Sequence, residues 1–238
     1  VYKDMSSGKS DDYIFFSKTS MAYKNLVTGK ADIIFALEPS KHQMEMAEQA
    51  GVELIFTPIG KEAFIFFANK DYGVNSLTKE QIVDIYTGEI NNWSHLGGMD
   101  AEIYPMRRPE NSCSQTIMEN IVMGGKGIKG AVLYETMYDI LEAAIDTSGK
   151  LGGQGTLGYS FRFFANEMSG YNEVKIMDIE NVPPSKENIA NGSYPFAVEF
   201  YAITTNESME KENVNKLISW LAGEEGQTLI EATGYNGM

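Results

Sequence analysis

Short apolar runs alternate with helical patterns along the first part of the chain. The apolar runs are Tyr13 to Phe16, Ala31 to Ala36 and Val52 to Phe56, and the helical patterns between them are Met21 to Val27 and Lys41 to Ala50. This β-α-β-α-β order predicts an α/β fold, with helices on both faces of a mostly parallel sheet. Because Ala31 to Ala36 is almost wholly apolar, we expect a parallel strand that is covered on both faces.

A second alternating series follows the most apolar stretch of the chain, Glu62 to Asn69. Thr78 and Gln81 have the spacing of a capping box and predict the start of a helix that Gly88 ends. Further strands are expected at residues 102–104, 157–161, 175–179 and 196–204, and further helices at 115–123, 134–144 and 211–221.

The same apolar stretch indicates a division into two lobes. Pro58 to Gly60 interrupts the pattern before it and polar residues follow it, so we place a crossing between lobes here. The second alternating series ends near residue 175, where the chain is expected to return. We therefore expect a discontinuous lobe 1 of residues 1–63 and 176–238, and a lobe 2 of residues 64–175.

Composition and charge restrict the class of partner. The chain has 238 residues, with 33 acidic and 19 basic side chains and a formal net charge of −14. Surfaces that bind nucleic acid need clustered Lys and Arg, so we expect no nucleic-acid partner. The longest apolar run is far shorter than the roughly 20 residues of a membrane-spanning helix. Contact with a membrane is therefore expected only through an anchor that has been removed.

Few residues are suited to metal or covalent chemistry. Cys113 is the single cysteine, which excludes an internal disulfide, and His42 and His95 lie far apart in the sequence. Because zinc sites need clustered ligands, we expect no metal and no cofactor. A helix start would lower the pKa of the Cys113 thiol, but no histidine lies nearby in the sequence to act as a base. We therefore expect no enzyme.

The segment from Met106 to Thr116 is suited to binding an anion. Ser112 and Ser114 stand in a hydroxyl-rich turn that opens a helix. Backbone N–H groups at a helix start lack partners within the helix, and the helix dipole is positive there. Arg108 lies four residues before Ser112 and could add charge-assisted bonds to a tetrahedral oxyanion. The alternative is a capped helix with Arg108 paired to a surface carboxylate.

A second hydroxyl-rich turn opens the first predicted helix. Thr19 and Ser20 precede Met21 to Val27, and Glu38 follows the strand at Ala31 to Ala36. N-capping would explain either hydroxyl alone. The presence of the same device in both lobes favours two helix starts and a carboxylate that face each other across a cleft.

A series of motifs has the order and spacing of one known family over nearly the whole chain, from about Ser17 to Tyr235. The motifs are Thr57 to Asn69, Ser76 to Ile82, Ile85 to Trp93, Leu96 to Gly98, Arg108 to Thr116 and Gly158 to Phe161. They closely resemble the substrate-binding protein of phosphate ABC transporters, in the type II periplasmic-binding-protein superfamily. The resemblance implies a two-lobe α/β fold that captures inorganic phosphate outside the cytoplasm for an ABC transporter permease, with a lipid anchor in the full-length protein.

The resemblance also implies roles for residues of lobe 2. Arg108 would be the cationic clamp, and Ser112 and Ser114 would give hydroxyl bonds to phosphate. The backbone amides of Cys113 and Ser114 would point at the same ligand.

In lobe 1 the resemblance matches Thr19 and Ser20 to the family's hydroxyl turn. It places Glu38 near a carboxylate that accepts the proton of hydrogen phosphate, with the register uncertain by one residue. These residues and those of lobe 2 would form one site between the lobes.

Two departures from the family pattern bear on function. The family's loop has glycine where this chain has Cys113, and the added side chain would stand at the cleft. The family's first strand and phosphate-contacting turn precede the residue at which this chain begins, so the resemblance implies an N-terminally incomplete fold with an exposed edge, open to self-association. The alternative function is a truncated, non-transport descendant that acts by protein–protein contact, with weak or no oxyanion binding.

Overall fold

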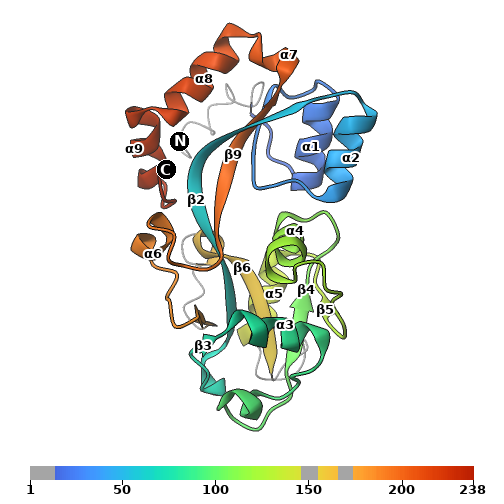
Figure 1. Cartoon of the computed structure of the whole chain (residues 1–238), viewed down its shortest axis with the longest axis vertical. Helices are drawn as coiled ribbons and strands as arrows, with labels where there is room; N and C mark the ends of the chain where they lie inside the picture. The colour runs from blue at the N-terminus through green and yellow to red at the C-terminus, as the bar shows by residue number, and fades with distance from the viewer. Residues whose placement is uncertain (1–13, 146–154, 166–173) are drawn as a thin grey trace.

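A computed structural model describes residues 14–145, 155–165 and 174–238. Two bodies lie one beyond the other along the long axis of the molecule, and the long strand β2 (Leu54–Asn69) runs through both (Figure 1). We call the body that contains helices α1 (Thr19–Val27) and α2 (Lys41–Gln49) lobe 1, and the other body lobe 2. The two-lobe α/β architecture expected from the sequence is confirmed.

In lobe 1 an antiparallel sheet lies between two layers of helices. Its middle strand, β9, pairs with β1 on one side and with the first half of β2 on the other. Tyr23, Ile34 and Ile203 are buried under α1 and α2, while Ile59 and Ala202 are buried on the face that α8 and α9 cover. Besides β2, α1 and α2, lobe 1 contains β1 (Ile33–Ala36), β9 (Ala197–Thr205), α7 (Asn206–Met209), α8 (Glu212–Ala222) and α9 (Glu224–Ala232).

In lobe 2 the second half of β2 pairs antiparallel with β6 on one side and with β7 on the other. β4 and β5 continue the sheet beyond β6 in parallel, and β3 pairs with β8 in a separate small sheet. Phe64 to Phe67 of β2 are completely buried and form the centre of the core. The strands are β3 (Ser76–Leu77), β4 (Tyr104–Arg107), β5 (Val132–Leu133), β6 (Thr156–Phe161), β7 (Val174–Ile176) and β8 (Asp178–Ile179). The helices are η2 (Lys70–Tyr72), α3 (Lys79–Thr87), η3 (Trp93–Leu96), α4 (Cys113–Ile117), η4 (Met118–Val122) and α5 (Met137–Ile145), and α6 (Lys186–Ala190) leads into β9.

Strand β2 joins two segments that the sequence predicts as separate strands. Its pairing register with β9 shifts between Pro58 and Gly60, so the predicted interruption is a β-bulge inside one continuous strand. Proline lacks an N–H and is tolerated at such an irregularity. The crossing between lobes therefore runs along a single strand.

The expectation of mostly parallel strands is wrong for lobe 1. β1 pairs antiparallel with β9, and Phe35 in the middle of β1 is 56% exposed, so the strand is not covered on both faces. The partner of β1 lies about 170 residues away in the sequence, as in the pair of Ile33 with Thr204, and its direction cannot be read from the apolar run itself.

The strand expected at Tyr13 to Phe16 is wrong for its described part. Ile14, Phe15 and Phe16 belong to no strand and are 51%, 67% and 76% exposed, while Tyr13 lies outside the described residues. Apolar side chains alone do not form a strand without a neighbouring strand to pair with. The following helix, α1, is present and begins at Thr19.

Local signals gave the correct boundaries of helix α3 in lobe 2. The capping box of Thr78 and Gln81 is formed at the start of α3, and Gly88 ends this helix in the left-handed conformation, with φ of 85°. The predicted limits of the two lobes stay a prediction. Since β7 and β8 pair with strands of lobe 2, we propose that the chain returns to lobe 1 along β9, later than residue 176.

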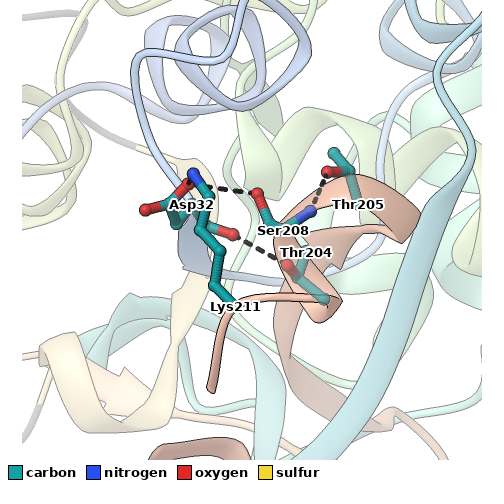
Figure 2. Close-up of polar contacts among 5 residues, drawn as sticks. All are labelled: Asp32, Thr204, Thr205, Ser208 and Lys211. Carbon is teal, nitrogen blue, oxygen red and sulfur yellow. Dashed lines mark hydrogen bonds and ion pairs between the residues drawn. The ribbon is translucent and has the colours of Figure 1, made fainter. Parts of the chain in front are cut away.

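A polar network fastens the start of β1 to the segment that follows β9 (Figure 2). Oδ1 of Asp32 lies 2.7 Å from Nζ of Lys211 and accepts a hydrogen bond of 3.1 Å from Oγ of Ser208. Oγ1 of Thr204 donates to the carbonyl oxygen of Asp32 at 2.8 Å, and Thr205 caps α7 by accepting from the N–H of Ser208. The hydrogen bond from Lys211 holds the pKa of Asp32 below its usual value.

Candidate functional site

The loop between β4 and α4 carries most of the predicted site. Asn111 takes the left-handed conformation, with φ of 64°, and turns the chain toward the helix. Ser112 is the N-cap of α4, and its hydroxyl accepts a hydrogen bond of 3.3 Å from the N–H of Gln115. Helix α4 continues directly into η4, so residues 113–122 form one helical segment. Cys113 and Ser114 therefore occupy the first helical turn, where the helix dipole is positive, and Ser114 is buried.

The backbone of Arg108 is fixed by buried polar side chains. Its N–H donates to Oε1 of Gln115 at 2.9 Å and to the hydroxyl oxygen of Tyr159 at 3.0 Å. Gln115 and Tyr159 have 2% and 0% of their surface exposed, and the Tyr159 hydroxyl in turn donates to Gln115. This network sets the position from which the Arg108 side chain extends.

The guanidinium of Arg108 has one satisfied and one unsatisfied buried donor. Nη1 donates to the carbonyl oxygen of Tyr134 at 2.9 Å. Within the described ranges, Nε of Arg108 is buried and has no hydrogen-bond acceptor. Burial lowers the pKa of Arg108 below its usual value, but an arginine keeps its proton in proteins. A buried, charged N–H without an acceptor is unfavourable and is suited to an anionic ligand.

Cys113 connects lobe 2 to lobe 1. Its sulfur lies near the backbone N–H of Leu37 and the hydroxyl of Thr19, both in lobe 1. Burial raises the pKa of the thiol to about 12, so Cys113 is protonated at neutral pH. A protonated thiol is a poor nucleophile.

Asn111 forms a second connection between the lobes. Oγ of Ser40 donates to Oδ1 of Asn111 at 2.7 Å, and Nε2 of Gln43 donates to the backbone oxygen of Asn111 at 3.4 Å. Ser40 and Gln43 also form the capping box of α2. In Figure 1, α4 accordingly lies at the end of lobe 2 that faces α1 and α2.

The structure brings some of the predicted site residues together. Thr19 contacts Cys113 across the lobes, and Ser112 and Ser114 belong to the same helix start as Cys113. Arg108 lies in the loop that leads to this helix, with its guanidinium directed to the carbonyl group of Tyr134.

The other predicted residues of lobe 1 lie at the surface. Ser20 is exposed in the first turn of α1, and Glu38 is exposed after β1. Burial raises the pKa values of the Tyr23 and Tyr201 hydroxyls, and the nearby charge of Glu38 adds to the rise. Thr19 and Ser20 are the first two residues of α1. The N-cap is Lys18, and no side chain caps this helix. The ligand roles of all seven residues stay predictions.

Sequence reasoning missed the lobe-1 residues that contact the loop. The spacing of Ser40 and Gln43 is a capping-box signal and could have located the start of α2. Asn111 precedes the cap Ser112, and asparagine is among the residues that tolerate positive φ. Leu37 gives no signal, because its contribution comes from the backbone.

Two surface cavities are lined by neither Thr19 nor Cys113. One, of about 640 Å³, is lined by Arg107, Gln115, Glu119 and Lys126, among others, and the other, of about 480 Å³, by Lys61, Lys79, Ser193 and Glu199, among others. Across the described ranges, no cluster of His, Cys, Asp or Glu is arranged to hold a metal ion. No helix in these ranges is both long and apolar enough to cross a bilayer.

Two phosphate-binding proteins are similar to this protein over most of its chain. The phosphate-binding protein PstS of Borreliella burgdorferi is 24% identical over 202 residues, which are 82% of this chain and 68% of the relative. PstS of Bacillus subtilis is 25% identical over 170 residues, which are 70% of this chain and 52% of the relative. The chain thus spans between about half and two thirds of the length of these two proteins.

Solved structures and a family profile agree with these relatives. A putative phosphate ABC transporter substrate-binding protein from Clostridium perfringens, with bound phosphate, has a TM-score of 0.73 and 25% identity, with 92% of this chain and 84% of that chain covered. An ABC-type phosphate transport receptor from Vibrio cholerae has a TM-score of 0.70 and 20% identity, with 92% and 85% covered, and supports the same fold. The profile of a PBP superfamily domain matches residues 16–225, and the chain therefore belongs to the periplasmic-binding-protein (PBP) superfamily, with the type II fold.

Proposed function

We propose that this protein captures inorganic phosphate, or a related tetrahedral oxyanion, between its two lobes. The observation that carries the proposal is the buried Nε of Arg108, a cationic donor without an acceptor in the described part of the chain. It belongs to the loop that leads into α4, whose first turn contains Ser112, Cys113 and Ser114. An oxyanion offers several acceptors to a guanidinium and to the N–H groups of a helix start. Thr19 would add a hydroxyl from lobe 1.

We also propose that the protein serves an ABC importer outside the cytoplasm. The names of its relatives and of the Clostridium perfringens structure support a role in phosphate transport. Membership in a superfamily of binding proteins and the protonated state of Cys113 support binding without catalysis. The permease would contact the surface formed by both lobes, and a lipid anchor would hold the full-length protein at the membrane.

Titration calorimetry with phosphate, sulfate and arsenate tests the proposal. Arg108→Lys keeps the charge but removes the planar fork of donors, so we expect phosphate affinity to fall about tenfold or more. Arg107→Lys is the matched control, because Arg107 lines the cavity of about 640 Å³, which neither Arg108 nor residues 112–114 line, and its phosphate affinity should stay within about twofold of wild type. Absence of heat with all three anions would refute the proposal.

A second candidate function is protein–protein contact by a descendant without transport activity. It is favoured by the exposed apolar side chains of Ile14, Phe15 and Phe16, and by Phe35 on β1, the edge strand of its sheet. Exposed apolar side chains in such numbers are typical of interaction sites. Light scattering coupled to size exclusion would detect a dimer, and Phe15→Ser with Phe16→Ser should convert it to monomer. A wild-type monomer that binds phosphate would exclude self-association as the function.

A further inference from the structure

Glu62 lies where β2 changes its partner, between its pairing with β9 of lobe 1 and its pairing with β6 of lobe 2. Its side chain is buried, with 5% of the residue exposed. Oε1 accepts a hydrogen bond of 2.7 Å from the N–H of Ala63, the next residue of β2. Oε2 accepts one of 3.2 Å from the N–H of Phe163, two residues after β6. The carboxyl group therefore joins the crossing strand to lobe 2.

The ring of Phe163 is also held by lobe 1. It stacks on the ring of Tyr235, with the ring centroids 4.2 Å apart and the planes at 19°. Tyr235 follows α9 and also packs against Phe200 of β9, with the ring centroids 4.8 Å apart. Groups from both lobes thus meet around Glu62. Separation of the lobes at this point would part Phe163 from Tyr235 and admit water to the carboxyl group.

The surroundings of Glu62 favour its neutral form. Burial raises its pKa to about 7, although the N–H groups of Ala63 and Phe163 and the charge of Arg162 oppose the rise. Tyr235 adds no charge at neutral pH, because burial, together with the charge of Glu62, raises the pKa of its hydroxyl to about 12. Water stabilises a carboxylate, so ionisation favours any arrangement of the lobes that exposes Glu62.

We propose that Glu62 is a proton-controlled hinge lock, whose neutral carboxyl group allows the lobes to stay in contact and whose ionisation drives them apart. The compact arrangement is the one in which Ser40 of α2 binds Asn111 beside the start of α4. With a pKa of about 7 when buried and its ordinary value of 4.5 when hydrated, the ratio of compact to open protein falls about tenfold between pH 6 and pH 8. Opening would also weaken a ligand site built from both lobes, and this second effect rests on the proposed function.

Small-angle X-ray scattering of the ligand-free protein tests the hinge lock. We expect the radius of gyration of wild type to increase from pH 6 to pH 8, while circular dichroism shows that the protein stays folded. Glu62→Gln cannot ionise, so its radius should be the same at both pH values. Glu89→Gln is the matched control, because Glu89 is exposed after α3, and this variant should expand as wild type does. Both variants keep His42 and His95, so any effect of the histidines is common to them.

Two outcomes of the scattering experiment would overturn the hinge lock. One is a wild-type radius that does not change between pH 6 and pH 8, which decides the matter even if Glu62→Gln fails to fold. The other is an equal expansion of wild type and Glu62→Gln, which would assign the change to other groups.

Calorimetry with phosphate in the same buffers tests the effect on the ligand site. We expect the dissociation constant to rise from pH 6 to pH 8 by up to about tenfold more in wild type than in Glu62→Gln. The ionisation of phosphate itself is the same for both proteins and cancels in the comparison. Equal rises would overturn the coupling of the hinge lock to the ligand site. If none of the proteins binds phosphate at either pH, the proposed function fails, and the scattering data alone decide the hinge lock.

Discussion

Glu62 places a carboxyl group inside the protein at the point where β2 passes from lobe 1 to lobe 2. Only 5% of the residue is exposed. Its Oε1 accepts from the N–H of Ala63 at 2.7 Å and its Oε2 from the N–H of Phe163 at 3.2 Å. Burial raises the pKa of Glu62 to about 7, although these two donors and the charge of Arg162 oppose the rise. The folded protein therefore holds a proton on Glu62 that the unfolded chain releases at lower pH.

We expect this proton to make stability depend on pH. The contribution of Glu62 is complete below its ordinary pKa of 4.5 and is lost as pH rises through about 7. The shift corresponds to about 3 kcal/mol in the free energy of unfolding. Urea unfolding at pH 5 and pH 8 should show this loss in wild type, whereas Glu62→Gln, which cannot ionise, should lack it.

Glu48→Gln is the matched control for Glu62, because Glu48 is exposed on α2. Its dependence on pH should equal that of wild type, since other ionisable groups such as Asp32 are unchanged. An equal loss in Glu62→Gln and wild type would show that Glu62 is ionised in the folded protein at both pH values.

At the scale of single residues, the sequence predicts which chemical groups the site contains, but it does not predict which residues are in contact. The cap at Ser112 and the helix it opens follow from local spacing and are present. The contact between Thr19 and Cys113 joins residues that are 94 positions apart in the numbering, and it depends on how the two lobes meet. Leu37 contributes only backbone groups, which no side-chain pattern can indicate.

At the scale of elements, Gly60 allows β2 to pass through the bulge. A Cβ atom at this position would lie 2.4 Å from Cε1 of Phe200 and 2.8 Å from the backbone oxygen of Asn236. The neighbouring Lys61 exchanges two backbone hydrogen bonds with Asn236, so this oxygen has little room to move. Only glycine fits without displacement of the C-terminal segment.

We therefore expect Gly60→Ala to lower the free energy of unfolding by about 2 kcal/mol or more, the usual effect of overpacking. Chemical denaturation with tryptophan fluorescence would measure it. Gly127→Ala is the control, because a Cβ atom there meets nothing within 4 Å. Comparable midpoints for the two variants would mean that Phe200 and the C-terminal segment move aside at no cost.

Elements with a local signal could be predicted, and those that depend on distant partners could not. The capping box of α3 involves residues that are close in sequence, and its prediction was correct. The direction of β1 depends on β9, which lies far along the chain, and the prediction of a parallel strand was wrong. Helix α9 was missed after α8, and Gly226 inside α9 would normally argue against a helix. Gly226 is needed there because a Cβ atom would lie 2.3 Å from the backbone oxygen of Trp220.

At the scale of the whole molecule, the net charge of −14 opposes the approach of an anion. The proposed site would work against this field through groups at close range, namely Arg108 and the N–H groups at the start of α4. Charges more than about 10 Å away are largely screened at moderate ionic strength. The acidic composition therefore excludes nucleic acid as a partner more firmly than it excludes phosphate.

Asn111 contributes to the contact that holds lobe 2 against lobe 1. Its side chain accepts the hydrogen bond from Ser40, while its backbone has a φ of 64° that glycine adopts easily. Asn111→Gly thus removes the side-chain contact with Ser40 without straining the turn, while the backbone oxygen that accepts from Gln43 remains. We expect a larger radius of gyration in small-angle X-ray scattering, and a free energy of unfolding within about 0.5 kcal/mol of wild type.

Asn181→Gly is a matched control for Asn111→Gly, since Asn181 also has positive φ, at 62°, and lies in the turn after β8 in lobe 2. Its backbone N–H donates to Oγ of Ser76, an interaction that glycine preserves. The radius of gyration of this variant should match wild type, because the turn does not take part in the contact between Asn111 and lobe 1. If Asn111→Gly is as compact as the control, the side-chain contact of Asn111 with Ser40 is not needed to hold the lobes together.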